Sequence, residues 1–327
     1  MKRVIVKGIG SHIPDCVLSN ADLEGMVDTT NEWIVSRTGI ESRRICLDTE
    51  MTSDISCEAA KKALENANIA VCDVDLIIVA TVTPDMQFPA TACIVQEKLG
   101  CVDIPCFDLS AACSGFIYAI DVARNFLLNN PVMKNVLVIG ADRFSSIVDW
   151  EDRSTCVLFG DGAGAVVLAR DTDDSGAGIL DVLIGADGRC VRDLYCLGWG
   201  VADIEKIEKK DRCVRMEGRA VFREAIKRMS AVIEDILLRN ELAVEDVACV
   251  IPHQANMRII TAIADRVGIS EEKMFINLQR TGNTSAASIP IAIDEAVQAE
   301  RVQSGDLILA VSFGGGITWG AALVRWK

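Results

Sequence analysis

The sequence predicts an α/β fold made of two similar halves, and three observations lead to this prediction. Short apolar, β-branched runs alternate along the chain with stretches of helical length. Similar segments recur in the same order in the second part of the chain. Half of the 327 residues (50%) are hydrophobic, so a large core can be buried and a disordered chain is excluded.

Six apolar runs predict the strands: Val74–Ala80, Asn135–Ile139, Gly164–Ala169, Val247–Ile251, Asp306–Val311 and Ala321–Val324. Four stretches between them predict helices: Ser53–Asn68, Ser114–Asn130, Met216–Asn240 and Ser285–Arg301. Strands that are apolar at successive positions are typical of sheets covered on both faces. We therefore expect mostly parallel strands with helices on both sides.

An internal repeat predicts the two halves. Four pairs of segments match in the same order: Asp75–Ala80 with Asp246–Ile251, Phe107–Leu109 with Ile276–Leu278, Val136–Ile139 with Leu307–Ala310, and Ala163–Arg170 with Trp319–Trp326. The offset is 169 to 171 residues for the first three pairs and 156 for the last, so an extra loop is expected near residues 142–161. The turn-like run at 171–176 divides the expected halves, residues 1–172 and 173–327.

Composition excludes several classes of function. Lys and Arg number 33 against 47 Asp and Glu, and the net charge of −14 disfavours nucleic acid as a partner. The 13 cysteines form no CxxC pair and the histidines are only His12 and His253, so we expect no metal site. No apolar run is long enough for a signal peptide or a membrane span, which indicates a cytoplasmic protein with reduced, buried cysteines.

Cys113 is the first candidate for chemistry. It follows the apolar run Phe107–Leu109, stands among small residues, and precedes a predicted helix. A thiol at a helix N-terminus faces unpaired N–H groups and the positive end of the helix dipole, which favour the thiolate. The pattern predicts a nucleophile, whereas the cysteine count alone would be satisfied by one more small core residue.

Two more positions stand at turns of the second half. His253 follows a predicted strand and precedes a helix, where ligands bind in open α/β sheets. Asn283 lies in a turn that corresponds, in the repeat, to the turn of Cys113. Cysteine can carry an acyl group, while histidine and asparagine can donate hydrogen bonds to a carbonyl oxygen that becomes negative.

Two glycine-rich segments complete the pattern. Phe313–Gly316 follows a strand, and its glycines would let backbone approach a ligand and offer an N–H to an oxyanion. Phe159–Ala165 is also rich in glycine but leads into a strand and lacks the lysine of a phosphate-binding loop, so phosphate binding is not expected there.

At these residues the whole chain resembles β-ketoacyl-acyl carrier protein synthase III, of the thiolase-like superfamily. Besides the Cys113 segment, the matching stretches are Gly8–Ser11, Asn20–Glu24, Asn31–Ile40, Phe159–Ala165, Pro252–Asn256, Gly282–Ser288 and Gly314–Gly320. The resemblance implies a five-layer αβαβα fold, a homodimer and no cofactor. It implies condensation of a short acyl-CoA with malonyl-acyl carrier protein, which releases CoA and CO₂ and initiates fatty acid biosynthesis.

The resemblance also implies residue roles. Cys113 would accept the acyl group, His253 and Asn283 would stabilise the enolate, and the backbone N–H groups of Cys113 and Gly315 would form the oxyanion hole. The remaining implied contacts are with CoA and its pantetheine (Thr29, Trp33, Arg37, Arg153, Asn256), the acyl pocket of the partner subunit (Phe88) and the acyl carrier protein (Arg219, Arg223, Arg258). Arg215 and Lys227 lie near the same docking segments, although a solvated helix face explains Arg223 and Lys227 equally well.

Relatives of this family differ at single residues. The last glycine loop, Phe313–Gly320, lacks the second cysteine that a biosynthetic thiolase needs. Asn283 argues against the Cys-His-His site of the elongating synthases, and Thr81 to Met86 hold no glutamate for a hydroxymethylglutaryl-CoA synthase. Chalcone-synthase-like enzymes share the Cys-His-Asn set but are usually longer.

Two alternatives of other kinds stay open at this point. One is an acyl hydrolase or simple acyltransferase on the same fold, which would load an acyl group without condensation. The other is a non-catalytic module that binds a carrier protein and would tolerate the loss of Cys113. The length of the primer acyl chain is not predicted.

Overall fold

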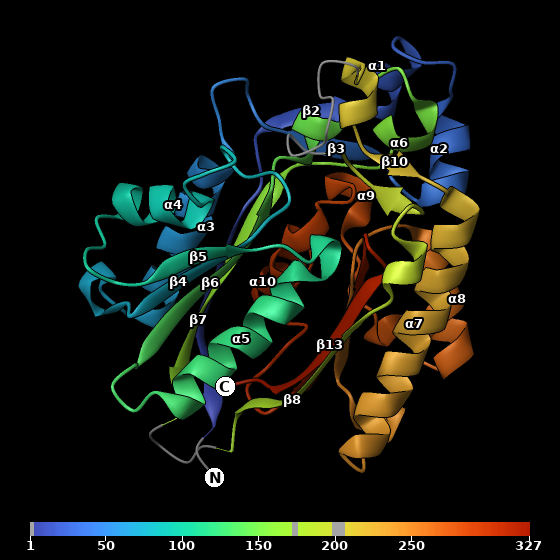
Figure 1. Ribbon diagram of the computed structural model, residues 1–327. Helices are drawn as coiled ribbons and strands as arrows, with labels where there is room; N and C mark the ends of the chain where they lie inside the picture. The colour runs from blue at the N-terminus through green and yellow to red at the C-terminus, as the bar shows by residue number, and fades with distance from the viewer. Residues whose placement is uncertain (1–2, 172–175, 198–206) are drawn as a thin grey trace.

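The computed structural model describes residues 3–171, 176–197 and 207–327. These residues form five layers in the order helix, sheet, helix, sheet, helix, as the resemblance implied (Figure 1). The expected boundary between residues 172 and 173 lies outside the described residues.

The first sheet has five strands in the order β1-β7-β6-β4-β5. Their bounds are β1 Val4–His12, β4 Leu76–Ala80, β5 Cys106–Leu109, β6 Asn135–Asp142 and β7 Gly162–Arg170. Strand β4 pairs in parallel with β5 and β6, whereas β7 pairs antiparallel with β1 and β6. Strand β5 is therefore at the edge of this sheet.

The second sheet repeats this plan. Its order is β11-β12-β13-β8, with bounds β8 Gly178–Ala186, β11 Cys249–Pro252, β12 Leu307–Gly314 and β13 Thr318–Arg325. Strands β11 and β12 are parallel, and β13 pairs antiparallel with β12 and β8. An isolated parallel bridge between Val250 and Met274 stands where β5 stands beside β4. The predicted duplication is confirmed by the strand order and the strand directions.

The six predicted strands all exist within a few residues of their expected bounds, but the prediction of mostly parallel sheets is wrong. Three of the seven pairs in the two sheets are parallel and four are antiparallel. Both faces of both sheets are covered by helices, so antiparallel strands such as β7 are also apolar at nearly every position. Burial on two faces therefore hides strand direction in the sequence.

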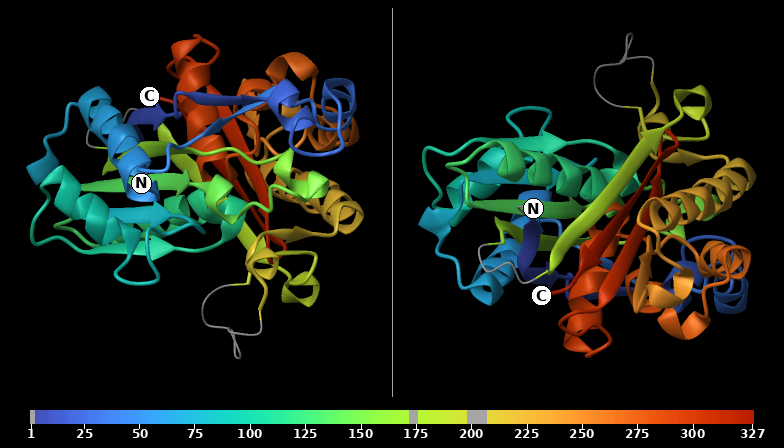
Figure 2. Two further views of the ribbon diagram at one scale, coloured as in Figure 1. Left: turned by 90° about the horizontal axis from the view of Figure 1, so that it is seen from above. Right: turned by 90° about the horizontal axis from the view of Figure 1, so that it is seen from below.

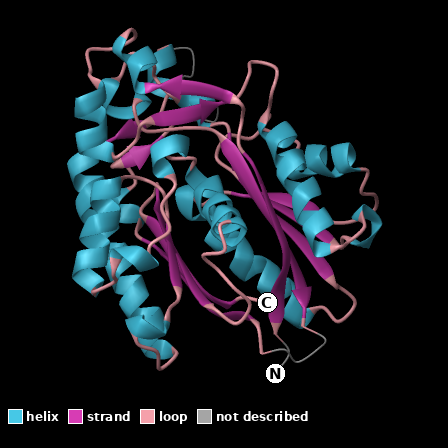
Figure 3. Cartoon of the chain, turned by 180° about the vertical axis from the view of Figure 1, so that it is seen from behind, coloured by secondary structure: helices cyan, strands magenta, loops and turns pink. Residues whose placement is uncertain are grey.

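Helices cover and separate the sheets. Helices α3 and α4 lie on the outer face of the first sheet, α5 and α10 lie between the sheets, and α7 with α8 forms the other outer layer (Figures 1 and 2). Figure 3 shows the central helices from behind, with strands on either side. The bounds are α1 Asn20–Glu24, α2 Asn31–Thr38, α3 Thr52–Ala67, α4 Thr91–Leu99, α5 Gly115–Asn129, α6 Arg153–Cys156, α7 Gly218–Arg239, α8 Met257–Val267, α9 Leu278–Thr281 and α10 Ser288–Gln298.

Short elements complete the chain. They are the ribbons β2 Cys16–Ser19 with β3 Ser42–Ile45 and β9 Leu194–Tyr195 with β10 Arg215–Met216, and the 3-10 helices η1 Val71–Asp73, η2 Ala112–Ser114, η3 Phe144–Ile147, η4 Gly188–Cys190, η6 Lys209–Arg212, η7 Val244–Asp246, η8 Glu271–Lys273 and η9 Ser285–Ala287. Figure 1 shows α1, α2, β2, β3 and α6 gathered at one end of the layers.

The N-terminal ends of the two central helices meet at the middle of the molecule. A single residue in left-handed backbone conformation begins each turn, Ala112 (φ 48°) before α5 and Ser285 (φ 52°) before α10. A Cβ on Gly140 of β6 would lie 2.5 Å from the carbonyl oxygen of Ala286, so this contact between the halves requires glycine. The equivalence of the two turns, predicted from the repeat, is confirmed.

Candidate active site

Cys113 lies in η2, between the end of strand β5 and the start of α5. Its side chain is only 6% exposed and lines a cavity of about 2120 Å³. The glycine loop after β12 lies against this turn: a Cβ on Gly314 would stand 2.7 Å from the backbone nitrogen of Cys113. Glycine at 314 is what allows the two halves to approach each other at the nucleophile.

The expectation that the helix N-terminus lowers the pKa of Cys113 is wrong. Burial raises the pKa of Cys113 to about 12, and the nearby carboxylate of Asp142 adds to the increase. The Ser285 hydroxyl lowers the pKa but offsets only part of this effect. The helix N-terminus is present as predicted, but removal of the thiolate from water outweighs it.

His253 follows the last residue of β11 and lines the same cavity. Its backbone N–H donates to the carbonyl of Val311 on the neighbouring strand at 2.8 Å, which fixes the main chain. The ring is 3% exposed, and its Nδ1 atom lies 2.6 Å from the hydroxyl oxygen of Ser288. Burial lowers the pKa of His253 to about 3, so the ring is neutral at ordinary pH.

Three hydrogen bonds fix Asn283, two of its backbone and one of its side-chain amide. Its N–H donates to Leu158 and its carbonyl accepts from Gly160, so the turn forms a bridge with the segment before β7. The Ser285 N–H donates to Asn283 Oδ1 at 2.9 Å. Because only an oxygen can accept this hydrogen bond, the Nδ2 group is the end left to donate.

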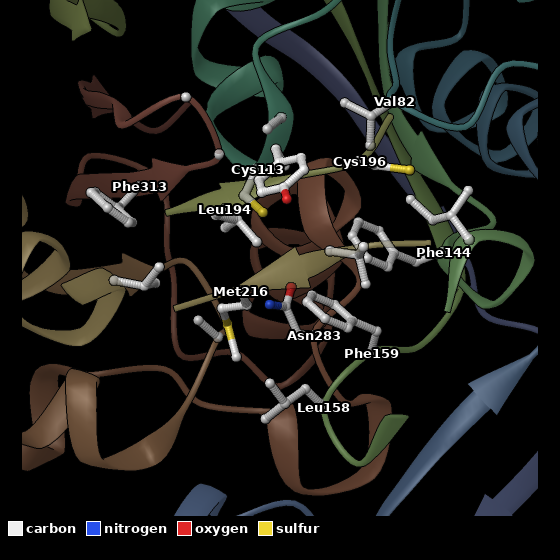
Figure 4. Close-up of a pocket in the computed structure, with 18 of the residues that line it drawn as sticks. Val82, Cys113, Phe144, Leu158, Phe159, Leu194, Cys196, Met216, Asn283 and Phe313 are labelled. Carbon is white, nitrogen blue, oxygen red and sulfur yellow. The ribbon is translucent and has the colours of Figure 1, made fainter. Parts of the chain in front are cut away.

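The structure therefore brings the three candidate catalytic residues to one cavity. Figure 4 shows the Cys113 thiol and the Asn283 amide facing this space. The rings of Phe144 and Phe159 also line it and stack on each other, with centroids 4.1 Å apart. Aromatic rings thus share the cavity wall with the histidine and the asparagine.

Gly315, the second candidate for the oxyanion hole, directly follows β12 and lines the cavity. A Cβ at this position would be 3.5 Å from the Cβ of Ala112, the residue before Cys113. The backbone of residue 315 and the turn of the nucleophile are thus neighbours across the interface of the two halves.

Candidate CoA contacts lie in and beside α2, and two of them, Thr29 and Arg153, are not among the residues that line the cavity. The Arg153 guanidinium stands 5.0 Å from the centre of the Trp33 ring, so these two side chains stack directly on each other. That spacing leaves no room for a purine between them, and adenine would have to separate them or stack on an outer face. Trp33 and Arg37 line the cavity, and the buried hydroxyl of Thr29 has no partner among the described residues.

Asn256 lines the cavity but is already used by the fold. Its Oδ1 accepts from the backbone N–H of Arg258 and caps α8, while its Nδ2 donates to the carbonyl of Arg37 at 3.1 Å. The second hydrogen of Nδ2 is the group that a pantetheine arm could use.

The basic residues divide into two groups. Arg219 of α7 and Arg258 of α8 line the mouth of the cavity, and the exposed Arg223 follows on α7. Arg215, by contrast, pairs with Asp149 at 3.5 Å. Its main contact is therefore within the fold.

Phe88 does not line the cavity of its own chain. Its side chain is 81% exposed on the segment between β4 and α4. The structure thus separates this candidate from the others within a single chain.

Two polar residues of the site were missed by sequence reasoning. Ser288 contacts His253, and the fully buried Asp142 at the end of β6 accepts hydrogen bonds from Thr81, Val82 and Ala286. Ser288 ends the stretch Gly282–Ser288 that carries part of the family resemblance, but nothing in the sequence pairs it with a histidine. Asp142 lies three residues beyond the predicted run Asn135–Ile139, and nothing in the sequence marked it as part of the site.

Residues 3–171, 176–197 and 207–327 contain no cluster of three or more potential metal ligands, and no helix in these ranges is long and apolar enough to cross a membrane. None of the 13 cysteines forms a disulfide; Cys93 and Cys106 are neighbours with their sulfurs 3.5 Å apart.

Comparisons with known proteins agree on one family. The model of 3-oxoacyl-[acyl-carrier-protein] synthase III matches residues 107–188, and the model of its C-terminal part matches residues 237–326. Beta-ketoacyl-[acyl-carrier-protein] synthase III of Caldanaerobacter subterraneus subsp. tengcongensis is 49% identical over 98% of this chain and 97% of its own length.

Solved structures lead to the same family. The crystal structure of 3-oxoacyl-[acyl-carrier-protein] synthase III from Aquifex aeolicus is 48% identical, covers both chains completely and has a TM-score of 0.91. The synthase III structure from Thermus thermophilus is 41% identical over 99% of each chain, with a TM-score of 0.92. The chain therefore belongs to the 3-oxoacyl-[acyl-carrier-protein] synthase III family and is an acyltransferase-type condensing enzyme of fatty acid synthesis.

Proposed function

We propose that Cys113, His253 and Asn283 catalyse the condensation of a short acyl-CoA with malonyl-acyl carrier protein. The products are a 3-oxoacyl-acyl carrier protein, CoA and CO₂. The observation that supports this assignment is that a thiol, a neutral imidazole and an oriented amide line one cavity.

In the first step the Cys113 sulfur attacks the thioester carbonyl of acyl-CoA. The negative oxygen of the tetrahedral intermediate accepts hydrogen bonds from the backbone N–H groups of Cys113 and Gly315. The carbon–sulfur bond to CoA breaks, and the proton lost by the cysteine ends on the CoA sulfur. Because burial raises the pKa of Cys113 to about 12, the thiol holds its proton at neutral pH and loses it as the sulfur attacks.

In the second step malonyl-acyl carrier protein loses CO₂, and its thioester carbonyl oxygen becomes an enolate. His253 and Asn283 donate hydrogen bonds to that oxygen, because the ring is neutral and the Nδ2 group of the amide is the free end. The enolate carbon attacks the acyl carbon on Cys113, and the thiolate leaves and takes a proton from solvent. Decarboxylation needs charge stabilisation and no strong base, which suits these two donors.

We assign substrate binding to the residues around the mouth of the cavity. Trp33 and Arg153 would stack on adenine, with Thr29, Arg37 and Asn256 contacting the rest of CoA. The exposed Arg219, Arg223 and Arg258 would receive the acidic carrier protein. On a chain of net charge −14, a local basic surface is what would attract such a partner.

We also propose a cytoplasmic homodimer that needs no cofactor, each chain with halves 1–172 and 173–327. Strand β5 is at the edge of its sheet and would pair with a second copy. Three exposed apolar residues stand on the segments before and after α4, close to β5 in the sequence: Met86, Phe88 (81% exposed) and Val102. They would be buried when β5 pairs with a second copy. Phe88 would then close the acyl pocket of the partner, and the free cysteines suit a reducing compartment.

Intact mass spectrometry tests the proposal. Wild-type protein mixed with acetyl-CoA should gain one acetyl group, and addition of malonyl-acyl carrier protein should remove it as acetoacetyl carrier protein. Cys113→Ala should gain none, whereas Cys196→Ala, which alters another cysteine that lines the cavity, should behave as wild type. An adduct that only hydrolyses would favour an acyl hydrolase, and an adduct on Cys113→Ala would refute the assigned nucleophile.

A further inference from the structure

We propose that Ser288 is a positioning residue that keeps His253 in the tautomer protonated on Nε2. In this form the histidine donates a hydrogen bond to substrate and cannot act as a base. The inference rests on the proposed role of His253, and it assigns to Ser288 no contact with substrate.

The geometry isolates one contact. Ser288 is the first residue of α10, and its side chain is only 2% exposed. Its hydroxyl oxygen lies 2.6 Å from Nδ1 of His253, which is 3% exposed. With Nδ1 occupied, Nε2 is the ring nitrogen left for the cavity that the histidine lines.

The direction of this hydrogen bond decides what the histidine can do. A neutral imidazole has one N–H, so one ring nitrogen donates and the other accepts. If the Ser288 hydroxyl donates to Nδ1, the proton is on Nε2 and that atom donates into the cavity. If Nδ1–H donates to Ser288, Nε2 becomes an acceptor that could take a proton from water. Only the first arrangement stabilises an enolate, and the second suits hydrolysis of the acyl-enzyme.

The segment that carries Ser288 also orients the second donor. Five residues earlier, Asn283 is held with Nδ2 free because its Oδ1 accepts from Ser285 N–H. The same turn is tied to the first half of the chain by the hydrogen bond from Ala286 N–H to Asp142. One short stretch, 283–288, thus sets the donor direction of both side chains that face the developing charge.

The tautomer can be measured directly because the sequence contains only two histidines, His12 and His253. In protein labelled with ¹⁵N on histidine, the ring nitrogen shifts distinguish protonated from unprotonated nitrogen, and His12 is the internal reference. We expect His253 to be neutral with the proton on Nε2 in the wild type. A proton on Nδ1 would overturn the inference even if the enzyme condenses its substrates normally.

Variants test whether Ser288 is the cause. In Ser288→Ala we expect loss of the pure Nε2–H form and a fall of roughly 10²-fold in malonyl-acyl carrier protein decarboxylation. Acetyl transfer from acetyl-CoA to Cys113 should change little, and Ser288→Thr should restore both the tautomer and the rate.

Ser230→Ala is the matched control, since Ser230 is also fully buried but has no hydrogen-bond partner among the described residues. It should keep the wild-type tautomer and both rates. An unchanged tautomer and decarboxylation rate in Ser288→Ala would overturn the inference. A wild type that never releases CO₂ from malonyl-acyl carrier protein would instead refute the proposed function and leave the tautomer result standing.

Discussion

Replacement of Asp142 by asparagine should weaken the junction between the two halves without any change in side-chain size. Asp142 is fully buried, and one of its oxygens accepts from Thr81 Oγ1, Val82 N and Thr83 Oγ1 at 2.8 to 3.1 Å. The other oxygen accepts from Ala286 N–H at 3.1 Å. Asp142 thus joins the end of β4 to the turn that carries Asn283.

The magnitude follows from these contacts. In Asp142→Asn the better orientation keeps three donors on the amide oxygen and turns the NH₂ group toward Ala286 N–H, where two donors meet. One buried N–H then has no acceptor, at a cost of about 1–3 kcal/mol. Because burial raises the pKa of Asp142, the loss of its charge adds no further cost, and we expect the free energy of unfolding to fall by about 1–3 kcal/mol.

Urea unfolding at one fixed protein concentration measures this loss, because an oligomer is stabilised by concentration. The control is Asp235→Asn, which makes the same substitution at an exposed position of α7. It should change the free energy of unfolding by less than about 0.5 kcal/mol. A loss below about 1 kcal/mol for Asp142→Asn would refute the reasoning, since a buried donor left without an acceptor costs at least that much.

Three further predictions follow from the site. Gly314→Ala should abolish acetylation of Cys113 in a mass assay while circular dichroism stays native, because the new Cβ would stand 2.7 Å from the Cys113 nitrogen; normal acetylation would contradict the close approach. The pKa of His253, lowered by burial to about 3, means that the unfolded chain takes up a proton first as pH falls from about 6.5, so stability should drop there by up to about 1.4 kcal/mol per pH unit. In His253→Gln the free energy of unfolding should fall less steeply with pH below about 6.5. Equal slopes in the variant and the wild type would contradict the lowered pKa of His253. Arg258→Glu should raise KM for the carrier protein about tenfold in low salt and leave KM for acyl-CoA unchanged. Equal effects on both KM values would contradict a role of Arg258 in docking the carrier protein.

Much of the fold could be predicted from the sequence because buried strands and amphipathic helices leave local patterns. The run at 135–139 marked β6, and the repeat marked the duplicated sheets. Strand direction could not be predicted, because a strand covered on both faces is apolar whichever way it runs.

The site divides in the same way. Cys113 was visible because a strand, a run of small residues and a helix follow one another in the sequence. The raised pKa of Cys113 could not be predicted, because the thiol is buried by segments distant in the sequence, such as the loop at Gly314. Ser288 was also invisible as a partner of His253, since the contact joins residues 35 positions apart.

The most direct test of the account separates the two chemical steps. His253→Ala and Asn283→Ala, each preloaded with acetyl-CoA, would be mixed with malonyl-acyl carrier protein, and CO₂ release and acetoacetyl carrier protein would be measured. The account predicts that both variants form the acetyl adduct on Cys113 but lose decarboxylation and condensation by at least about 10²-fold. Wild-type CO₂ release in either variant would contradict the claim that these two side chains stabilise the enolate.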